Sequence, residues 1–464
     1  MTGQQAATIS KKDSEFRNFA LNGNIWHVVL YVGLPLALYQ TLTLLFKIVD
    51  SMMAAHISSN AVSAVSYLSQ INLMLSAIGS GLAVGSSLKI SESYGAGDYD
   101  QVKTQISSMF ALCGLLGISV LVLLIPFTTP FLRLLKTPDV FIAEGSLYFI
   151  LELIAMVISF FNNIYIAVER ARGNSKRIFF LNTAAILLKL SLTAYFVYIL
   201  HCRIHMIAVA TILSQSALLA AAMINMNKKG NAFGFSLSSI SLHPTVIGPM
   251  IHLSIPVPEE KIAFAFGKVV VNSMSTVYSA LTVGALGISN NIGGFAVSPQ
   301  CGIQEGGAAV ISQNLGAGNP KRALQSFRCT LIINILIGSI FMILTLLFLP
   351  WLGWMFAGSD QEFADMIMSI YRWEAMGAIP LGVHAAVMAL LYGFKKTRIT
   401  LYINASRVFV FRIPVLWFLQ TFTDLGNVSV GVVMAVSNVG VGLLSALIAV
   451  YEIRKICKEY QISF

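Results

Sequence analysis

The chain has 464 residues, of which 56% are hydrophobic and only 11% are charged, and its mean hydropathy is +0.77. A soluble domain carries about 25% charged residues, so this composition excludes an ordinary soluble protein and indicates a chain that lies in a lipid bilayer. The net charge of +10 is dispersed between apolar segments, which excludes the contiguous basic surface that nucleic-acid binding requires.

The polar segment 1–25 precedes an apolar run that is too long for a signal peptide, so we expect this run to be retained as the first helix. Apolar segments of about 20 residues, each long enough to cross the hydrocarbon core, recur along nearly the whole chain. The sequence therefore predicts an all-α membrane protein with twelve transmembrane helices. In chain order they are 26–56, 63–92, 105–130, 141–168, 178–200, 204–226, 247–277, 281–312, 324–352, 364–393, 399–421 and 428–452.

Basic residues are distributed unevenly between the two sides of this topology. If both termini are cytoplasmic and the spans alternate, twenty Lys and Arg residues fall on the cytoplasmic side and three on the other. Such a bias places the basic side in the cytoplasm. We therefore expect a multi-pass protein of the cell membrane, in a bacterial inner membrane, with cytoplasmic N and C termini. We expect it to be a monomer embedded in the lipid bilayer.

Prolines and glycines recur at a constant offset of 221 residues, without gaps. The pairs are Pro35 with Pro256, Lys47 with Lys268, Gly81 with Gly302, Gly85 with Gly306, and Gly95-Ala96-Gly97 with Gly316-Ala317-Gly318. Farther along, Ser214-Gln215 corresponds to Ser437-Asn438 at an offset of 223. Because prolines and glycines dictate backbone shape, this pattern predicts two halves of similar architecture. Internal repeats in an apolar chain are typical of secondary transporters.

A polar stretch near the middle of the chain, 227–241, separates the two halves. It predicts an N-lobe of six helices (26–227), a cytoplasmic linker (228–246), a C-lobe of six helices (247–456) and a cytoplasmic tail (457–464). An even number of helices in each repeat puts both repeats the same way up. We therefore expect two six-helix bundles related by a pseudo-twofold axis along the membrane normal, with the site in the cleft between them.

Several motifs resemble those of one transporter family. They are Gly33-Leu34-Pro35, Gln40 and Val49-Asp50 in the first helix, the loops Gly95-Ala96-Gly97-Asp98 and Ser312-Gln313-Asn314-Leu315-Gly316-Ala317-Gly318-Asn319-Pro320-Lys321-Arg322-Ala323, and Arg407 with Arg412-Ile413-Pro414. Over about residues 26 to 456 the chain resembles the MATE (multidrug and toxin extrusion) family of the MOP flippase superfamily. The resemblance implies a twelve-helix antiporter that exports cationic or amphipathic small molecules in exchange for H+ or Na+, without any other cofactor.

Asp50 is the first candidate for cation coupling, because it lies deep in the first helix and matches the acidic position of the family's Val-Asp motif. One carboxylate can hold a proton, a sodium ion or a cationic substrate, and competition among them couples their movements. Lys47 lies three residues earlier on the same helical face, within pairing reach. The alternative is that Lys47 and Asp50 form a buried structural ion pair.

In the second repeat, Val271 stands opposite Asp50, so the site departs from the family there. Glu260, Phe264 and Lys268 share one face of the seventh helix. Glu260 is a candidate for the site, and Glu259 and Glu260 alternatively stabilise the helix N-terminus. We expect Lys47 to pair with Asp50, and Lys268 to pair with Glu260 or Glu305.

Charged and polar residues in other spans complete the candidate site. They are Gln40, Gln304, Glu305, Arg372, Glu374 and His384. Charged groups inside a membrane are expected to face an interior or a wet cavity. Arg372 and Glu374 are two residues apart, so they do not share a helical face, and a lone His384 fits a packed hydrogen-bonding residue. Arg407 lies near a predicted helix end, where we expect it to snorkel to the interface.

Other functions remain open on this sequence. A flippase or exporter for anionic or lipid-linked substrates is the alternative, because Lys47, Lys189, Lys268 and Arg372 make the predicted cleft basic. An enzyme would need clustered acids, histidines or a nucleophile, and a channel would not need the repeat. The five cysteines lack metal-ligand spacing and are expected to pack between helices, so no metal site is predicted.

Overall fold

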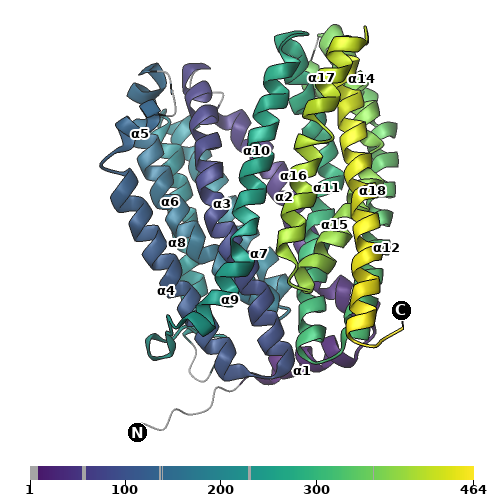
Figure 1. The fold of residues 1–464 in the computed structure, drawn as a ribbon. Coiled ribbons are helices and arrows are strands. Elements are labelled where there is room, and N and C mark those ends of the chain that lie inside the picture. Colours follow the sequence, from purple (N-terminus) through teal and green to yellow (C-terminus); the bar gives the residue numbers. More distant parts are fainter. Residues whose placement is uncertain are drawn as a thin grey trace. The chain divides into compact units, whose positions relative to one another are not determined.

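The computed structural model describes residues 9–54, 59–134, 137, 139–227, 231–358 and 360–463. Every regular element in these residues is helical, which confirms the predicted all-α class (Figure 1). Each predicted span is matched by one helix or by two consecutive helices. In chain order they are α2 (Ile25–Ala54), α3 (Ser59–Ala96), α4 (Tyr99–Leu124), α6 (Asp139–Ala171), α7 (Ser175–Ala194) with the π-helix η1 (Tyr195–Ile199), α8 (His205–Met226), α9 (Pro244–Ser254) with α10 (Pro256–Ser275), α11 (Ala280–Gly316), α12 (Pro320–Leu347), α14 (Gln361–Ala375) with α15 (Ala378–Gly393), α16 (Thr397–Phe409) with α17 (Ile413–Phe422), and α18 (Val428–Glu459).

Four short helices were not predicted from the sequence. They are α1 (Lys11–Asn22), α5 (Thr128–Leu134), the 3-10 helix η2 (Leu237–Ser239) and α13 (Leu349–Ala357). Three predicted spans are also broken within their length. The seventh breaks before Pro256, the first residue of α10. Proline has no N–H to donate to the preceding turn, so it suits the start of a helix and not its interior. The tenth bends by 49° between α14 and α15, and the eleventh is interrupted between Phe409 and Ile413.

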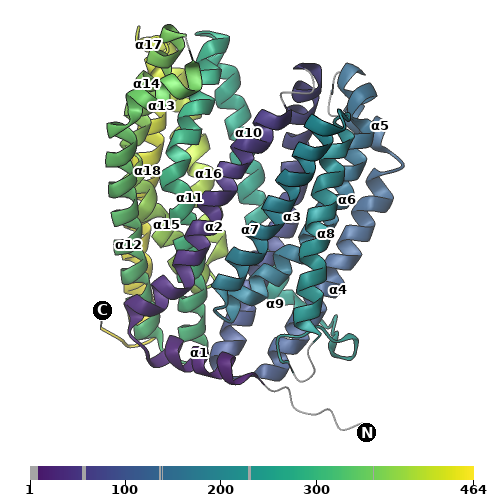
Figure 2. The same ribbon diagram turned by 180° about the vertical axis from the view of Figure 1, so that it is seen from behind.

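The chain divides into two compact units. Unit 1 comprises residues 1–21 and 45–258, and unit 2 comprises residues 22–44 and 259–464. In unit 1, α6 contacts both α3 and α8, and the three helices run side by side (Figure 2). In unit 2, α11, α12 and α15 pack on one another and α15 contacts α18. The unit boundaries differ from the predicted lobe boundaries, because the first part of α2 belongs to unit 2 and α9 belongs to unit 1.

Close contacts at glycines explain why the first part of α2 belongs to unit 2 and why α9 belongs to unit 1. In unit 2, a Cβ atom on Gly302 would lie 2.3 Å from the Ala37 backbone nitrogen, and one on Gly306 would lie 2.7 Å from Gly33 Cα. The backbones of α2 and α11 can therefore approach only because α11 carries no side chain at these two points. In unit 1, the equivalent Gly81 of α3 lies against Pro258. The contact between each repeat's second helix and the other repeat's first helix thus occurs twice.

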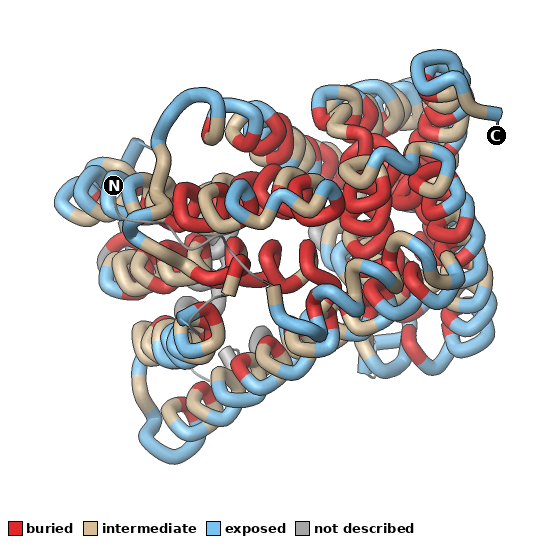
Figure 3. The backbone as a smooth tube through the Cα atoms, turned by 90° about the horizontal axis from the view of Figure 1, so that it is seen from below, coloured by how far each residue is buried: buried red, intermediate tan, exposed pale blue. Residues whose placement is uncertain are grey.

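Apolar side chains divide between helix contacts and the outer surface. Phe149 and Phe160 are completely buried in the core of unit 1, as Ile367 and Ile370 are in unit 2. Figure 3 shows buried residues along the faces by which helices meet and exposed residues along the opposite faces. Many exposed residues are large and apolar, such as Trp417, as expected for helices whose outer faces contact lipid.

Among the described helices, nine are long and apolar enough to cross a membrane individually, and the bent pair α14–α15 makes a tenth. The helices α10 and α11 are long enough but too polar. α10 contains Glu259, Glu260, Lys261 and Lys268, and α11 is rich in Gly, Ser, Asn and Gln. Polar residues in a membrane segment are expected to face the protein interior or a water-filled cavity. These two helices are therefore where a polar site is to be sought.

The segment before the first span forms α1, which packs against the C-terminal end of α3 in unit 1. Arg17 donates from Nε to the Tyr94 carbonyl (3.0 Å) and from Nη2 to the Gly95 carbonyl (2.7 Å). These carbonyls lie at the C-terminus of α3, where the helix leaves acceptors unsatisfied and favours a cation. The Tyr94 hydroxyl donates to the Asp13 carbonyl. A segment that the sequence shows only as polar is therefore a packed helix.

The predicted linker, 228–246, also packs on unit 1 in its described part. Phe233 is completely buried and makes an edge contact with Tyr94 at 5.1 Å between ring centroids. The guanidinium of Arg172 lies 5.5 Å from the Phe233 ring centroid. Two backbone N–H groups of the linker donate to serine hydroxyls of α4, that of Ser236 to Ser107 and that of Ser241 to Ser108. Lys228, Lys229 and Gly230 lie outside the described residues.

Candidate functional site

Unit 2 contains a half-buried carboxylate on α10. Tyr392 of α15 donates its hydroxyl to Glu260 Oε2 at 3.2 Å, and Thr400 and Asn404 of α16 also reach this carboxylate. Pro256 fixes the start of α10, which turns Glu260 toward these helices and leaves Glu259 exposed. Glu259 lies in the first turn, as expected of an acid that stabilises a helix N-terminus. Glu260 instead belongs to a polar cluster between three spans.

A second carboxylate is buried between α11 and α14. Glu374 is 7% exposed, and Oε2 accepts a hydrogen bond from the Ser289 hydroxyl. Gly293 leaves the room for it, since a Cβ atom there would lie 3.1 Å from Glu374 Oε1. Arg372 is exposed while Glu374 is buried, which confirms that these two residues of α14 do not share a face.

A third carboxylate lies where α2 and α11 approach each other. Gln40 donates from Nε2 to Glu305 Oε1 at 3.2 Å, and both side chains are half-buried. The neighbouring Gln304 is half-buried as well. Gly302 and Gly306, which lie on either side of Glu305 in the sequence, pack closely on the backbone of α2. Two candidates that lie 265 positions apart in sequence are therefore direct neighbours.

His384 is a packed residue of α15. It is 8% exposed, and Nδ1 lies 2.9 Å from the Ser445 hydroxyl of α18. This confirms its interpretation as a buried hydrogen-bonding residue. The side chain thereby joins two spans of unit 2, α15 and α18.

Three basic groups surround the Phe264 ring of α10. The Arg407 and Arg412 guanidinium carbons lie 5.2 Å and 5.3 Å from the ring centroid, and Lys268 Nζ lies 5.8 Å from it. These distances permit cation–π attraction. The shared face that was predicted for Phe264 and Lys268 is confirmed, and Lys268 is exposed. Its pairing with Glu260 or Glu305 stays a prediction.

The expectation that Arg407 snorkels to a helix end is wrong. Its Nη2 donates to Asn438 Oδ1 at 2.7 Å. Arg412 donates from Nε to the Ser437 hydroxyl at 2.9 Å, and its Nη2 lies 3.5 Å from the same Asn438 oxygen. Both arginines flank the break between α16 and α17. Their hydrogen bonds to Ser437 and Asn438 of α18 hold them inside unit 2. Glu374 lies within electrostatic range of both guanidinium groups.

The candidate pair in the first repeat is only partly described. Lys47 lies in the portion of α2 that belongs to unit 1 and is exposed. Asp50 lies in α2, but its side chain falls outside the described part of the structure. The ion pair between these residues, and the coupling role of Asp50, stay predictions.

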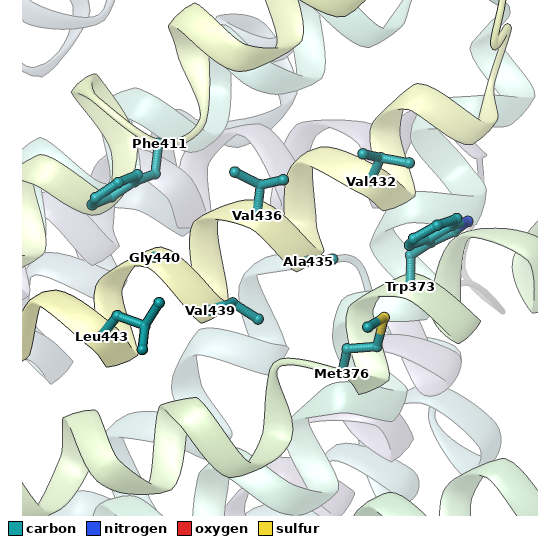
Figure 4. A pocket seen from close by; sticks show the side chains of 9 residues that line it. All are labelled: Trp373, Met376, Phe411, Val432, Ala435, Val436, Val439, Gly440 and Leu443. Atoms are coloured by element: carbon teal, nitrogen blue, oxygen red, sulfur yellow. The ribbon is translucent and has the colours of Figure 1, made fainter. Parts of the chain in front are cut away.

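Unit 2 contains an apolar pocket of about 400 Å³ with no charged residue in its lining (Figure 4). Its lining residues come from the end of α14, the α16–α17 break and one face of α18. They are Trp373, Met376, Phe411, Val432, Ala435, Val436, Val439, Gly440 and Leu443. Ser437 and Asn438, on the same helix, are not among them. The pocket therefore offers no charged group for recognising an ion.

Among the described residues, no three His, Cys, Asp or Glu side chains gather as metal ligands would. The sequence did not reveal Ser289, Tyr392 or Asn438 as contact residues of the site. Their signal was weak, because a single hydroxyl, amide or ring in an apolar span is compatible with ordinary helix packing.

The family assignment rests on matches in both halves of the chain. The MatE family model matches residues 35–195 and 256–418, which together exceed half of the chain, and the two matches begin at the repeat-related Pro35 and Pro256. The chain is 23% identical over 333 residues to "Probable multidrug resistance protein YoeA" of Bacillus subtilis (strain 168), which covers 70% of this chain and 72% of that protein. It is likewise 23% identical over 313 residues to "Probable multidrug resistance protein YpnP" of the same organism, covering 65% of this chain and 67% of that protein.

Solved structures show the same fold. A crystal structure of MATE in complex with MaL6 gives a TM-score of 0.91 at 17% identity, covering 97% of this chain and 100% of that one. A MOP superfamily transporter from Pyrococcus furiosus, whose structure is described as having a binding pocket of reverse polarity, gives 0.89 at 18% identity, covering 97% and 99%. The protein therefore belongs to the MatE family and is a multi-pass membrane transporter.

Proposed function

We propose that this transporter is a secondary antiporter that exports amphipathic, cationic small molecules in exchange for H+ or Na+ by alternating access. The B. subtilis relatives bear the name of multidrug resistance proteins, which supports a broad range of small-molecule substrates. The coupling ion and the charge of the substrate are the parts of this proposal that need direct measurement.

The observation that carries the proposal is the way in which the carboxylates of α10 and α14 are held. Glu260 is held by the Tyr392 hydroxyl and Glu374 by the Ser289 hydroxyl. A hydroxyl can donate to a carboxylate and can also accept from a protonated carboxyl, so it does not fix one charge state. A carboxylate held in this way inside a membrane span can exchange a proton, a sodium ion or an organic cation. Binding of one of these then displaces another, which is the requirement for antiport.

Asp50 belongs to this proposal as a second coupling group, with Lys47 as its expected partner. Glu305 and Gln40 supply a further carboxylate and amide. We assign Glu260 the first role in unit 2, because its nearest polar partners are neutral side chains of α15 and α16. The remaining candidates, Arg372, Gln304 and His384, have no role in ion exchange in this proposal.

The test is transport by the purified full-length protein in sealed vesicles. A proton gradient and a sodium gradient are imposed in separate experiments, and accumulation of a lipophilic cationic dye is measured. The proposal predicts that one of the two gradients drives accumulation, and that an ionophore which dissipates this gradient stops it. Accumulation that is indifferent to both gradients would contradict antiport.

A second candidate function is export or flipping of an anionic or lipid-linked substrate. It is favoured by the positive groups around Phe264, namely Lys268, Arg407 and Arg412. The structure of the P. furiosus transporter carries the description that reverse pocket polarity suggests a different function for that protein. The same vesicles distinguish the candidates, because an anionic amphiphile replaces the cationic dye as the transported compound. Gradient-driven movement of the anion alone would support this second function.

We also propose the setting in which the transporter works. The predicted excess of basic residues on one side supports a location in the cell membrane of a bacterium, with both termini in the cytoplasm. Each unit has its own core, so the proposal is that a monomer suffices for transport. The measurement that checks the last point is the mass of the protein in a lipid nanodisc that supports substrate binding.

A further inference from the structure

Arg407 and Arg412 form a close pair of positive charges inside unit 2. Their Nη2 atoms lie 2.7 Å and 3.5 Å from the same oxygen, Asn438 Oδ1, and their guanidinium carbons lie at nearly equal distances from the Phe264 ring. An amide oxygen carries only a partial negative charge, so it reduces the repulsion between the two cations without neutralising it. The two guanidinium groups therefore carry more positive charge than the Asn438 oxygen offsets.

Within the described part of the chain, neither guanidinium has a carboxylate within 4.0 Å. Glu374 is the carboxylate that acts on both electrostatically, but it is held by Ser289 on α11. One carboxylate also leaves an excess positive charge for two arginines. A buried ion without a close partner is costly, so a second anion would stabilise this arrangement.

The unused hydrogen-bond donors point in the same direction. Arg407 makes one hydrogen bond to the protein through Nη2, and its buried Nε has no acceptor among the described residues. Arg412 uses Nε and Nη2 and keeps Nη1 without a protein acceptor in the described chain. Guanidinium N–H groups fit carboxylate and phosphate oxygens in a forked geometry. Two neighbouring guanidinium groups with unused N–H donors therefore fit an anion with several oxygens better than they fit a spherical anion.

One arginine of the pair is partly exposed. Arg412 is 2% exposed, but Arg407 and Phe264 are only half-buried, and Lys268 at the edge of the same ring is exposed. Arg407 is therefore the member of the pair with exposed surface, and Lys268 lies beside the same ring. From these contacts we infer that Arg407 and Arg412, seated on Phe264 and Asn438, form a binding site for an oxyanion, a phosphate or carboxylate group. This site goes beyond the proposed exchange of cations and does not depend on it.

The inference is tested by binding to the purified full-length protein in a neutral detergent, without any ion gradient. Three probes separate the sources of the anion. Inorganic phosphate represents a free ion, dodecyl phosphate represents an amphiphile, and nanodiscs of phosphatidylglycerol compared with phosphatidylcholine represent a lipid headgroup. Dodecyltrimethylammonium, with the same alkyl chain and the opposite charge, is the control for hydrophobic binding. We expect saturable binding of at least one anionic probe and its weakening by roughly tenfold or more in Arg407→Gln. Arg328→Gln, which removes an exposed arginine of α12, is the matched control and should bind as the wild type does.

Asn438→Asp separates binding from folding, because it puts a carboxylate in the place where Asn438 meets both arginines. This variant should keep or raise the unfolding temperature, since it neutralises the pair, and should lose the anion. Which anionic probe binds identifies the source, and any of the three with this variant pattern supports the site. Wild-type protein that binds no anionic probe would show that the arginines only join α16, α17 and α18. Undiminished binding by Asn438→Asp, or an equal loss in Arg328→Gln, would also overturn the inference.

The binding measurements need no ion gradient, so a negative result would exclude the anion site without excluding antiport. In the same way, a negative transport experiment would exclude antiport without excluding the anion site.

Discussion

Gly302 of α11 lies against Ala37 of α2, so closely that a Cβ atom on Gly302 would be 2.3 Å from the Ala37 backbone nitrogen. Shifted by the repeat offset, the same pair becomes Gly81 and Pro258, and these residues are in contact too. A Cβ atom on Gly81 would lie 2.4 Å from Pro258 Cδ. The two repeats therefore share a contact as well as a pattern of residue types. It joins the first helix of each repeat to the second helix of the other.

The first prediction is that Gly302→Ala destabilises the protein by about 1–3 kcal/mol, the usual cost of forcing extra atoms into a packed contact. The matched control is Gly287→Ala on the same helix, where a Cβ atom would meet nothing within 4 Å. That change should be neutral or stabilise by about 0.4–1 kcal/mol, because alanine restricts the unfolded chain. Thermal unfolding in detergent measures both. Equal unfolding temperatures for the two variants would refute the close contact.

The second prediction concerns adjacent acids of α10. Glu260→Gln should abolish gradient-driven transport, because an amide keeps the shape and hydrogen bonding of the carboxyl but cannot exchange a proton or hold a cation by charge. Glu259→Gln should transport as the wild type does, since Glu259 is exposed in the first helical turn. Initial rates of dye accumulation, with equal amounts of folded protein in the vesicles, provide the measurement. Normal coupling by Glu260→Gln would exclude Glu260 as the coupling group of unit 2.

The third prediction concerns the docking of α1. Arg17→Gln removes the charged donors to the Tyr94 and Gly95 carbonyls, so protection of α1 against hydrogen exchange should fall by roughly tenfold or more. Lys12→Gln, at an exposed position of the same helix, should leave it unchanged. Exchange followed by mass spectrometry on residues 9–22 gives the result. Unchanged protection in Arg17→Gln would mean that the other contacts of α1 hold it in place.

The fourth prediction uses two native cysteines to test the membrane topology. Cys202 lies in a predicted outer loop and Cys457 near the predicted cytoplasmic end of α18, and the two are similarly half-exposed. A membrane-impermeant maleimide added to intact cells should label Cys202 and not Cys457. Cys202→Ser should remove the label, and permeabilised cells should add labelling that Cys457→Ser abolishes. Labelling of Cys457 alone in intact cells would reverse the proposed orientation.

The apolar segments and charge pattern were sufficient to predict the helical class and the twelve spans, and the constant offset of prolines and glycines predicted the repeat. The exchange of first helices was not predictable, because hydropathy shows that a residue such as Ala37 is buried but not which helix buries it. The breaks were only partly visible. Pro256 and Pro414, which lie in the first turns of α10 and α17, mark two of them in the sequence.

The same reason limits the prediction of the site. Glu260, Glu305 and Glu374 were identifiable, because an acid in a membrane span is costly and therefore conspicuous. Their partners were not identifiable, since a hydroxyl such as Ser289 is common in membrane helices and lies 85 positions away from Glu374. Arg407 was assigned to a helix end from its position in the span, but spacing along one helix does not reveal an acceptor such as Asn438 on another.

The most direct test of antiport is ion movement that the substrate itself drives. Vesicles containing the purified protein are prepared without any gradient, loaded with a pH-sensitive or a sodium-sensitive dye, and then given a lipophilic cation from outside. Antiport predicts that entry of the cation drives H+ or Na+ out of the vesicle, in proportion to the cation taken up, and that protein-free vesicles show no such efflux. Uptake of the cation with neither proton nor sodium movement would contradict the account.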